Sequence, residues 1–198
     1  MGHDYLGSTG REDGVSAELT ERVLRARAGD RAAFDLLAAG VVDGLYRIAR
    51  LVLRDTDVAE DAVQEALVRC WRDLPSLRDP ARFEAWLRRL LMRAVTDEFR
   101  RGRRARAAIT LLRLEPAIPD AAEDIVVREQ LDRGFGRLTV EHRAVIVLRL
   151  YLGLSVEDTA LTLGIPVGTT KSRLHYAMEA MRVALEADAR PTSREVSA

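Results

Sequence analysis

The sequence contains one cysteine, three histidines and no long apolar run, and each shortage makes a class of protein less plausible. Cys70 is the only cysteine, so the chain cannot form an intramolecular disulfide. No apolar segment approaches the roughly 20 residues needed to cross a bilayer. The first fourteen residues lack the basic and then apolar pattern of a signal peptide. We therefore expect a cytoplasmic protein without membrane insertion.

The sequence also shows no convergent set of catalytic side chains. Catalysis needs acids, bases or metal ligands that converge on one place. The histidines are His3, His142 and His175, which fall in an expected N-terminal arm and in two separate expected helices. We predict no catalytic residue, no metal site and no cofactor, and we expect that the protein is not an enzyme.

The apolar spacing is helical throughout, and strand signals are negligible. It predicts helices near 18–28, 31–53, 58–73, 81–101, 123–135, 140–152, 156–163 and 167–187. Asp30, Asp57 and Asp79 are the expected N-caps in the first half. We predict an all-α fold with two small helical domains joined by a flexible acidic linker. The expected bounds are a disordered arm over 1–17, domains over 18–106 and 123–188, a linker over 107–122 and a tail over 189–198.

The formal net charge is zero, but the charges are segregated along the chain. From Arg78 to Arg106 there are ten arginines against four acidic residues. From Glu115 to Asp132 there are six acidic residues and one arginine. Charge segregation of this kind matters more for partners than the total does. The basic block indicates nucleic-acid binding.

The segment from Ser155 to Arg173 has the spacing of a helix-turn-helix. Ser155 can cap a short helix, Ala160 is small enough for a close helix crossing, and Gly164 can supply the turn. In the next helix, polar and basic side chains gather near the N-terminus, where a recognition helix contacts base edges and phosphates. A charged helical face is more often simply solvated, but the combined spacing favours DNA binding.

Two stretches carry a resemblance to known families. Residues 165–175, IPVGTTKSRLH, and residues 138–150, LTVEHRAVIVLRL, resemble the fourth conserved region of extracytoplasmic-function (ECF) sigma factors. They are also similar to the C-terminal domains of LuxR-type regulators. The C-terminal half alone therefore leaves two functions open: an alternative sigma factor, or a stand-alone LuxR-like helix-turn-helix transcription regulator.

The N-terminal half favours the sigma factor. Asp61, Gln64 and Glu65, followed by Trp71, resemble the sigma segment that binds the β′ clamp helices of core RNA polymerase. A solvated acidic face is the simpler interpretation of periodicity alone. A LuxR-type protein would instead carry a receiver or ligand-sensing domain, which the helical 18–106 segment fits poorly. The resemblance implies recognition of −10 and −35 promoter elements, docking near the polymerase β flap and an inhibitory anti-sigma partner.

The resemblance also implies residue roles. For the −10 element it implies Arg78, Arg82, Arg88, Arg89, Arg93, Arg100, Arg101, Arg103 and Arg104. For the −35 element it implies Arg149, Thr169, Lys171, Ser172, Arg173, His175 and Tyr176. Several positions depart from the family pattern: Arg93 stands where asparagine is common, Thr159 and Thr170 where apolar residues are usual, and Tyr176 and Glu179 where arginine is common.

Overall fold

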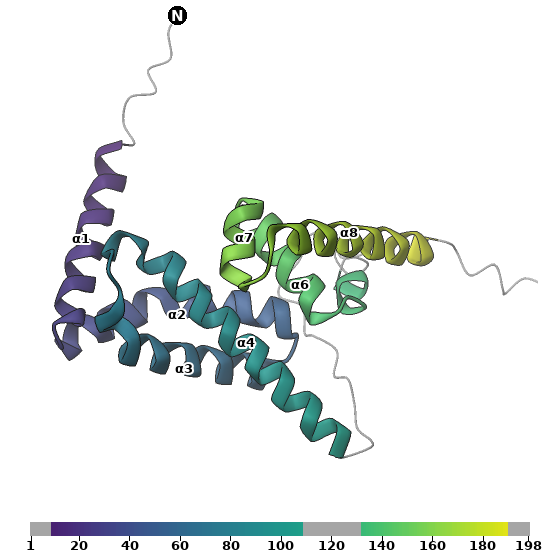
Figure 1. Ribbon diagram of the computed structural model, residues 1–198, viewed down its shortest axis with the longest axis horizontal. Helices are drawn as coiled ribbons and strands as arrows, with labels where there is room; N and C mark the ends of the chain where they lie inside the picture. The colour runs from purple at the N-terminus through teal and green to yellow at the C-terminus, as the bar shows by residue number, and fades with distance from the viewer. Residues whose placement is uncertain (1–8, 109–131, 190–198) are drawn as a thin grey trace, which may run out of the picture.

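The computed structural model describes residues 9–108 and 132–189 of the 198-residue chain. These residues are helical apart from short turns, and they contain no strand. Helices α1 to α4 form a bundle, and α6 to α8 form a second group at one end of it (Figure 1). This arrangement confirms the predicted all-α fold with two helical domains. The predicted linker falls almost wholly on residues 109–131, which lie outside the described residues.

The first group contains α1 (Thr9–Arg27), α2 (Arg31–Leu53), α3 (Thr56–Asp73) and α4 (Phe83–Ala108), with two short 3-10 turns, Leu74–Ser76 and Pro80–Arg82, before α4. Its core is formed by side chains that recur at helical spacing on each helix, including Leu37, Val52, Ala66, Phe83 and Leu91. Cys70 belongs to this core, and burial raises the pKa of its thiol to about 12. It is therefore an inert, apolar packing residue.

Two predicted helix starts were wrong. The α1 helix begins at Thr9, so residues 9–17 are helical rather than part of a disordered arm. The N-cap of α3 is Asp55, whose carboxylate accepts a hydrogen bond from the Val58 N–H at 3.1 Å, and not Asp57, which lies in the first turn. Asp55 is the cap because Arg54, the residue before it, adopts a left-handed conformation (φ 59°). This conformation ends α2 and turns the chain into Asp55. The caps predicted at Asp30 and Asp79 are confirmed.

The corrected cap gives a stability prediction with a built-in control. Asp55→Ala should lower the free energy of unfolding by about 1 kcal/mol, because the Val58 N–H loses its acceptor. Asp57→Ala removes only a favourable carboxylate from the first turn and should cost about 0.3–0.5 kcal/mol. Urea unfolding followed by circular dichroism compares the two. Equal losses would mean that Asp55 is not the functional cap.

The second group begins with residues 132–136, which are helical, and continues through α6 (Val140–Ile146) into a π turn over Val147–Tyr151. Helix α7 (Val156–Leu163) matches its predicted bounds, is capped by Ser155 and ends at Gly164, whose φ is 67°. Helix α8 (Val167–Ala189) follows directly. The helix-turn-helix geometry is thus produced by a hydroxyl cap at one end of α7 and a left-handed glycine at the other.

Thr159 and Thr170, which depart from the family pattern, are both fully buried. The hydroxyl of Thr159 donates to the Ser155 carbonyl at 2.8 Å, and that of Thr170 donates to the Pro166 carbonyl at 3.3 Å. A threonine that bonds back to the carbonyl four residues earlier leaves only its methyl group to pack against neighbours. Both threonines are therefore compatible with the apolar interior of the helix-turn-helix.

The two groups pack directly against each other. Four residues of α6 and the π turn, Val140, Ala144, Val147 and Leu148, belong to the same buried cluster as the core of α1 to α4. Helix α7 lies beside α4 (Figure 1). Within the described ranges, no helix is long and apolar enough to cross a membrane.

Candidate nucleic-acid interface

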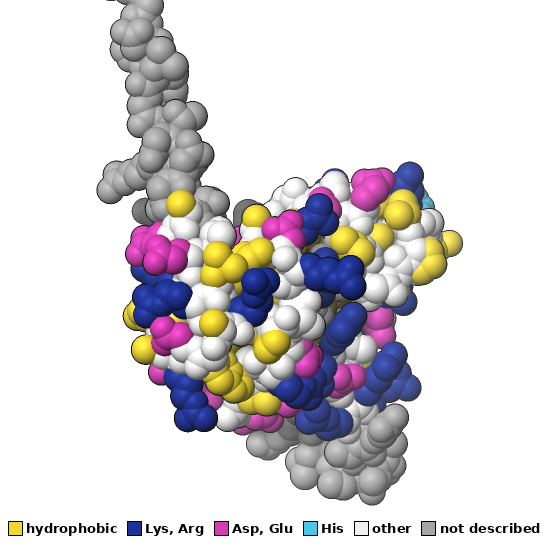
Figure 2. All heavy atoms as spheres, turned by 60° about the vertical axis from the view of Figure 1, so that its left-hand side comes forward, with side chains coloured by type: hydrophobic (Ala, Val, Ile, Leu, Met, Phe, Trp, Pro, Cys, Tyr) yellow, Lys and Arg dark blue, Asp and Glu magenta, His cyan; other side chains and the backbone are white. Residues whose placement is uncertain are grey.

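Helix α4 is built with one buried side and one basic side. Phe83, Leu87, Leu91 and Val95 are among the residues that face the core, and the arginines of the helix whose side chains are described are half-buried or exposed. Figure 2 shows Lys and Arg side chains crowded toward the lower right of the molecule. The helical period therefore places the arginines of the basic block on the surface of α4.

The arginines of this surface differ in how they are held. Arg88 forms an ion pair with Glu84 at 3.5 Å, and Arg101 forms one with Glu98 at 2.7 Å. No ion pair to a described residue engages the other four arginines of α4 whose side chains are described, Arg89, Arg93, Arg100 and Arg103. An arginine without an internal carboxylate partner keeps its donors for phosphates.

Of the other predicted −10 residues, Arg78 and Arg82 are exposed in the loop before α4, and Arg82 forms an ion pair with Asp79 at 3.2 Å. The backbone of Arg104 is helical, but its side chain lies outside those described. The structure therefore brings the −10 set to one helix and the loop that leads into it.

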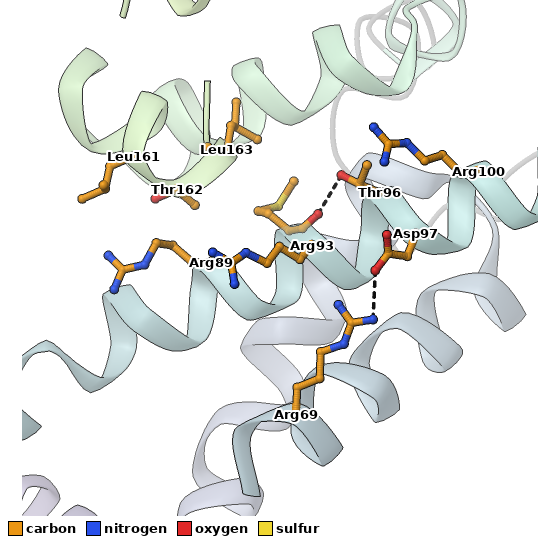
Figure 3. Close-up of a pocket in the computed structure, with 11 residues that line it drawn as sticks. Arg69, Arg89, Arg93, Thr96, Asp97, Arg100, Leu161, Thr162 and Leu163 are labelled. Atoms are coloured by element: carbon orange, nitrogen blue, oxygen red, sulfur yellow. Dashed lines mark hydrogen bonds and ion pairs between the residues drawn. The ribbon is translucent and has the colours of Figure 1, made fainter. Parts of the chain in front are cut away.

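A pocket of about 280 Å³ lies between α4 and α7 (Figure 3). On the α4 side its lining includes Arg89 and Arg93, which point toward Leu161, Thr162 and Leu163 of α7 (Figure 3). Below them, Arg69 of α3 reaches up to Asp97 of α4 at 2.9 Å (Figure 3). This pocket is the place where the basic surface meets the second half of the chain.

The ion pairs of Arg69 with Glu65 and Asp97 also change which residues of the expected polymerase-binding face of α3 are available to a partner. Asp61 and Gln64 are exposed, as a partner surface requires. Glu65 is instead half-buried and accepts from Arg69 Nε at 2.8 Å. Since Arg69 joins Glu65 to Asp97, Glu65 fastens α3 to α4 and is only partly available to a partner. Sequence spacing could not separate this role from an exposed one.

The predicted −35 residues, apart from Arg149, lie in the first three turns of α8. Lys171, Ser172, His175 and Tyr176 are exposed, and Thr169 and Arg173 are half-buried. The His175 and Tyr176 rings contact each other edge to face, with 5.6 Å between the ring centroids. Arg149 lies apart, in the π turn, and its Nε is buried without a hydrogen-bond partner among the described residues. Helix α8 thus offers a compact set of donors near its N-terminus, of the kind that reads a DNA groove.

Glu179 stands on α8 where arginine is common in the family. It forms an ion pair with Arg182 at 2.6 Å, and this hydrogen bond from Arg182 holds the pKa of the Glu179 carboxyl below its usual range. Arg182 also pairs with Glu186. Two carboxylates share one arginine here, so this part of α8 keeps a net negative charge and does not attract phosphates.

Three polar residues that join the two halves were not singled out in the sequence. Arg54 of α2 forms an ion pair with Asp132, and Arg143 of α6 donates to the backbone carbonyl of Val52. The partners are far apart in the chain, and no local pattern marks them. Among the described residues, no group of three or more histidine, cysteine or acidic side chains is arranged to hold a metal ion.

Comparison with known families finds matches in both halves. Residues 37–105 match the family model for sigma-70 region 2, and residues 128–181 match that for sigma-70 region 4. The ECF RNA polymerase sigma factor SigM of Mycobacterium tuberculosis is 36% identical over 168 residues, covering 85% of this chain and 83% of the relative. The RNA polymerase sigma-E factor of Streptomyces coelicolor is 35% identical over 156 residues, covering 77% of this chain and 88% of the relative.

Two solved structures share the fold. The sigma factor RpoE of Bartonella quintana, solved in complex with the anti-sigma factor NepR, has a TM-score of 0.66 and 27% identity, covering 78% of this chain and 98% of that one. CnrH, solved in complex with the cytosolic domain of CnrY, has a TM-score of 0.60 and 27% identity, covering 87% of this chain and 99% of that one. A LuxR-like regulator finds no support in these matches, because the first half matches sigma-70 region 2.

Proposed function

The chain belongs to the ECF group of the sigma-70 family and is an alternative RNA polymerase sigma factor, and from this premise we propose how its residues bind polymerase and promoter DNA. The observation that carries the proposal is the order of the matches: region 2 with its open arginines on α4, followed by region 4 with its donors on α8. One chain would then supply two DNA contacts and two polymerase contacts.

The −10 contact is assigned to α4. Its arginines Arg89, Arg93 and Arg100 have no internal carboxylate partner among the described residues, and they project from a helix fixed by core packing. Contacts to phosphates fix the register of a DNA strand, and they make affinity fall steeply with salt. We assign Arg88 and Arg101 supporting roles, because Glu84 and Glu98 already neutralise part of their charge.

The −35 contact is assigned to the start of α8. Lys171, His175 and Tyr176 are exposed there and suit readout of base edges in the major groove. Thr169 and Arg173 are half-buried and better placed for the flanking backbone. We keep Arg149, which is half-buried in the π turn, in the phosphate-contacting set because the family resemblance implies it; its buried Nε would not itself reach a phosphate.

Core polymerase would bind the exposed acidic face of α3 around Asp61 and Gln64, and would also contact the region 4 domain near the β flap. Asp61→Lys should weaken binding to purified core polymerase by about 5-fold, since an unfavourable charge at an interface slows association and destabilises the complex. Asp43→Lys, an exposed reversal on α2, is the matched control. Glu65 is a poor test because its loss also frees Arg69. If both variants bind as the wild type does, the polymerase surface lies elsewhere.

Run-off transcription with purified core polymerase tests the whole proposal. We expect initiation from promoters selected by the protein and none from core polymerase alone. The protein would not act as an enzyme itself, because its contribution is binding and positioning. Absence of initiation at every selected promoter, together with binding of intact duplex by the chain alone, would instead indicate a conventional regulator.

An anti-sigma factor is a further proposed partner, since the structural relatives RpoE and CnrH were solved in complexes and the first is described with an anti-sigma factor. Because polymerase and promoter DNA are its proposed partners, we place its activity in the cytoplasm.

A further inference from the structure

The loop between α3 and α4, residues 74–82, carries two of the predicted −10 residues, Arg78 and Arg82. Both arginines are exposed, whereas Leu74 and Leu77 of the same loop are buried in the core of the first helical group. One short 3-10 turn lies on each side of Arg78. The α3–α4 loop therefore holds two arginines at the surface, beside the start of the basic helix α4.

Contacts inside the loop fix Arg82 but not Arg78. The Asp79 carboxylate accepts a hydrogen bond from the Ala81 N–H at 3.1 Å and forms an ion pair with Arg82 at 3.2 Å. The Asp79 carbonyl also accepts from the Arg82 N–H at 3.1 Å. Among the described residues, no ion pair engages Arg78. The direction in which Arg78 points therefore depends on the backbone that carries it.

An arginine of α1 holds that backbone. Arg27 Nη1 donates to the Leu77 carbonyl oxygen at 3.1 Å, although the two residues are 50 positions apart in the chain. The Leu77 carbonyl and the Arg78 N–H belong to one planar peptide unit, so a hydrogen bond to the carbonyl also orients the chain at Arg78. A charged donor makes a stronger hydrogen bond than a neutral one. Arg27 therefore sets how the α3–α4 loop presents Arg78.

Arg27 is itself held by the corner between α1 and α2. Arg25 Nε and Nη2 donate to one carboxylate oxygen of Asp30, at 3.0 and 2.7 Å. The other oxygen of Asp30 caps α2 by accepting from the Ala33 N–H at 3.0 Å. Val23, one turn before Arg27, is fully buried in the core. The end of α1 is thus fixed to α2, and α1 lies beside the α3–α4 loop (Figure 1).

We propose that α1 supports −10 recognition and that Arg27 is a positioning residue, which acts through the Leu77 carbonyl to hold Arg78 in place for the promoter strand. This inference rests on the proposed function for the identity of the DNA. It extends the −10 contact from α4 to the α3–α4 loop. It also gives a role to α1, which precedes residues 37–105, the part of the chain that matches sigma-70 region 2.

Hydrogen–deuterium exchange in the free, full-length protein tests the loop contact without DNA. Arg27→Met keeps an apolar stem but removes the donor, so amides of residues 77–82 should exchange about 5-fold faster than in the wild type. Arg27→Lys keeps a cationic donor and should recover most of the protection. Arg31→Met, an exposed change at the start of α2, removes the same charge and should leave the loop unchanged. Wild-type exchange of the loop in Arg27→Met would overturn the proposal.

A double-mutant cycle in the complex with core polymerase tests the link to the promoter. The probe is a labelled single strand carrying a −10 element selected by that complex, and fluorescence anisotropy measures its affinity. Arg27→Met should weaken binding about 3-fold, because apparent affinity scales with the fraction of loops in the competent arrangement. Arg78→Ala should weaken it about 5-fold by removing a phosphate contact. If Arg27 acts through Arg78, the double variant should also lose about 5-fold rather than about 15-fold.

Two results would contradict this positioning role. Losses that multiply in the double variant would mean that Arg27 acts independently of Arg78, as a direct DNA contact does. A loss in Arg31→Met equal to that in Arg27→Met would mean that charge alone lowers affinity. Failure of the sigma-factor assignment would look different: the wild-type chain with core polymerase would bind no −10 strand, while the exchange difference between the wild type and Arg27→Met persisted.

Discussion

Replacing Arg93 and Arg100 together by alanine is expected to weaken binding of single-stranded −10 DNA by at least about 10-fold at moderate salt. Both side chains are exposed on α4, and neither forms an ion pair with a described residue. Because each is assigned a phosphate, the slope of log K against log salt concentration should fall by about 1.4 in magnitude, at about 0.7 per contact to a single strand. Fluorescence anisotropy across a salt series measures affinity and slope together.

The matched control is Arg31→Ala with Arg47→Ala. These arginines are also exposed and free of ion pairs to described residues, but they lie on α2. The control removes the same charge from a helix to which no DNA contact is assigned. It should therefore lower affinity only slightly and leave the salt slope almost unchanged. If both double variants lose affinity and slope equally, the protein attracts DNA through its overall charge, and α4 holds no dedicated −10 site.

Much of the fold could be predicted because its determinants are local. The bounds of α2 and α7 follow from caps that sit beside the apolar repeat: Asp30 before α2, and Ser155 and Gly164 on either side of α7. Asp55 was missed in favour of Asp57 because both lie close to the start of the apolar repeat. Only the left-handed turn at Arg54, which depends on how α2 ends, decides between them.

The candidate site was predictable in composition but not in its internal pairing. Spacing alone placed the arginines on one helix, yet it could not show that Glu65 is tied to Arg69 and Asp97. The contacts of Arg54 with Asp132 and of Arg143 with Val52 join residues from different halves of the chain, so no periodicity predicts them. On α8, Ala177 is fully buried while the neighbouring Met178 is exposed, a difference that apolar character alone does not predict.

The second large effect is expected at the −35 element. Lys171→Ala and His175→Ala should each change the preferred bases at one or two positions, with a loss of discrimination of about 1–3 kcal/mol, or about 5- to 150-fold. Both side chains are exposed in the first three turns of α8, where they can reach base edges. The measurement is selection of duplexes from a library randomised over the −35 element, with sequencing of the bound pool.

Arg173→Ala separates base reading from backbone anchoring on the same helix. Its side chain is half-buried and assigned to phosphate, so its loss should lower affinity for all duplexes by a similar factor and leave their ranking intact. Met178→Ala, an exposed change two turns beyond Lys171, should alter neither ranking nor affinity. If the Lys171 and His175 variants keep the wild-type ranking, these residues do not read bases. Specificity would then have to come from DNA shape, sensed through the backbone contacts of Thr169, Arg173 and Arg149.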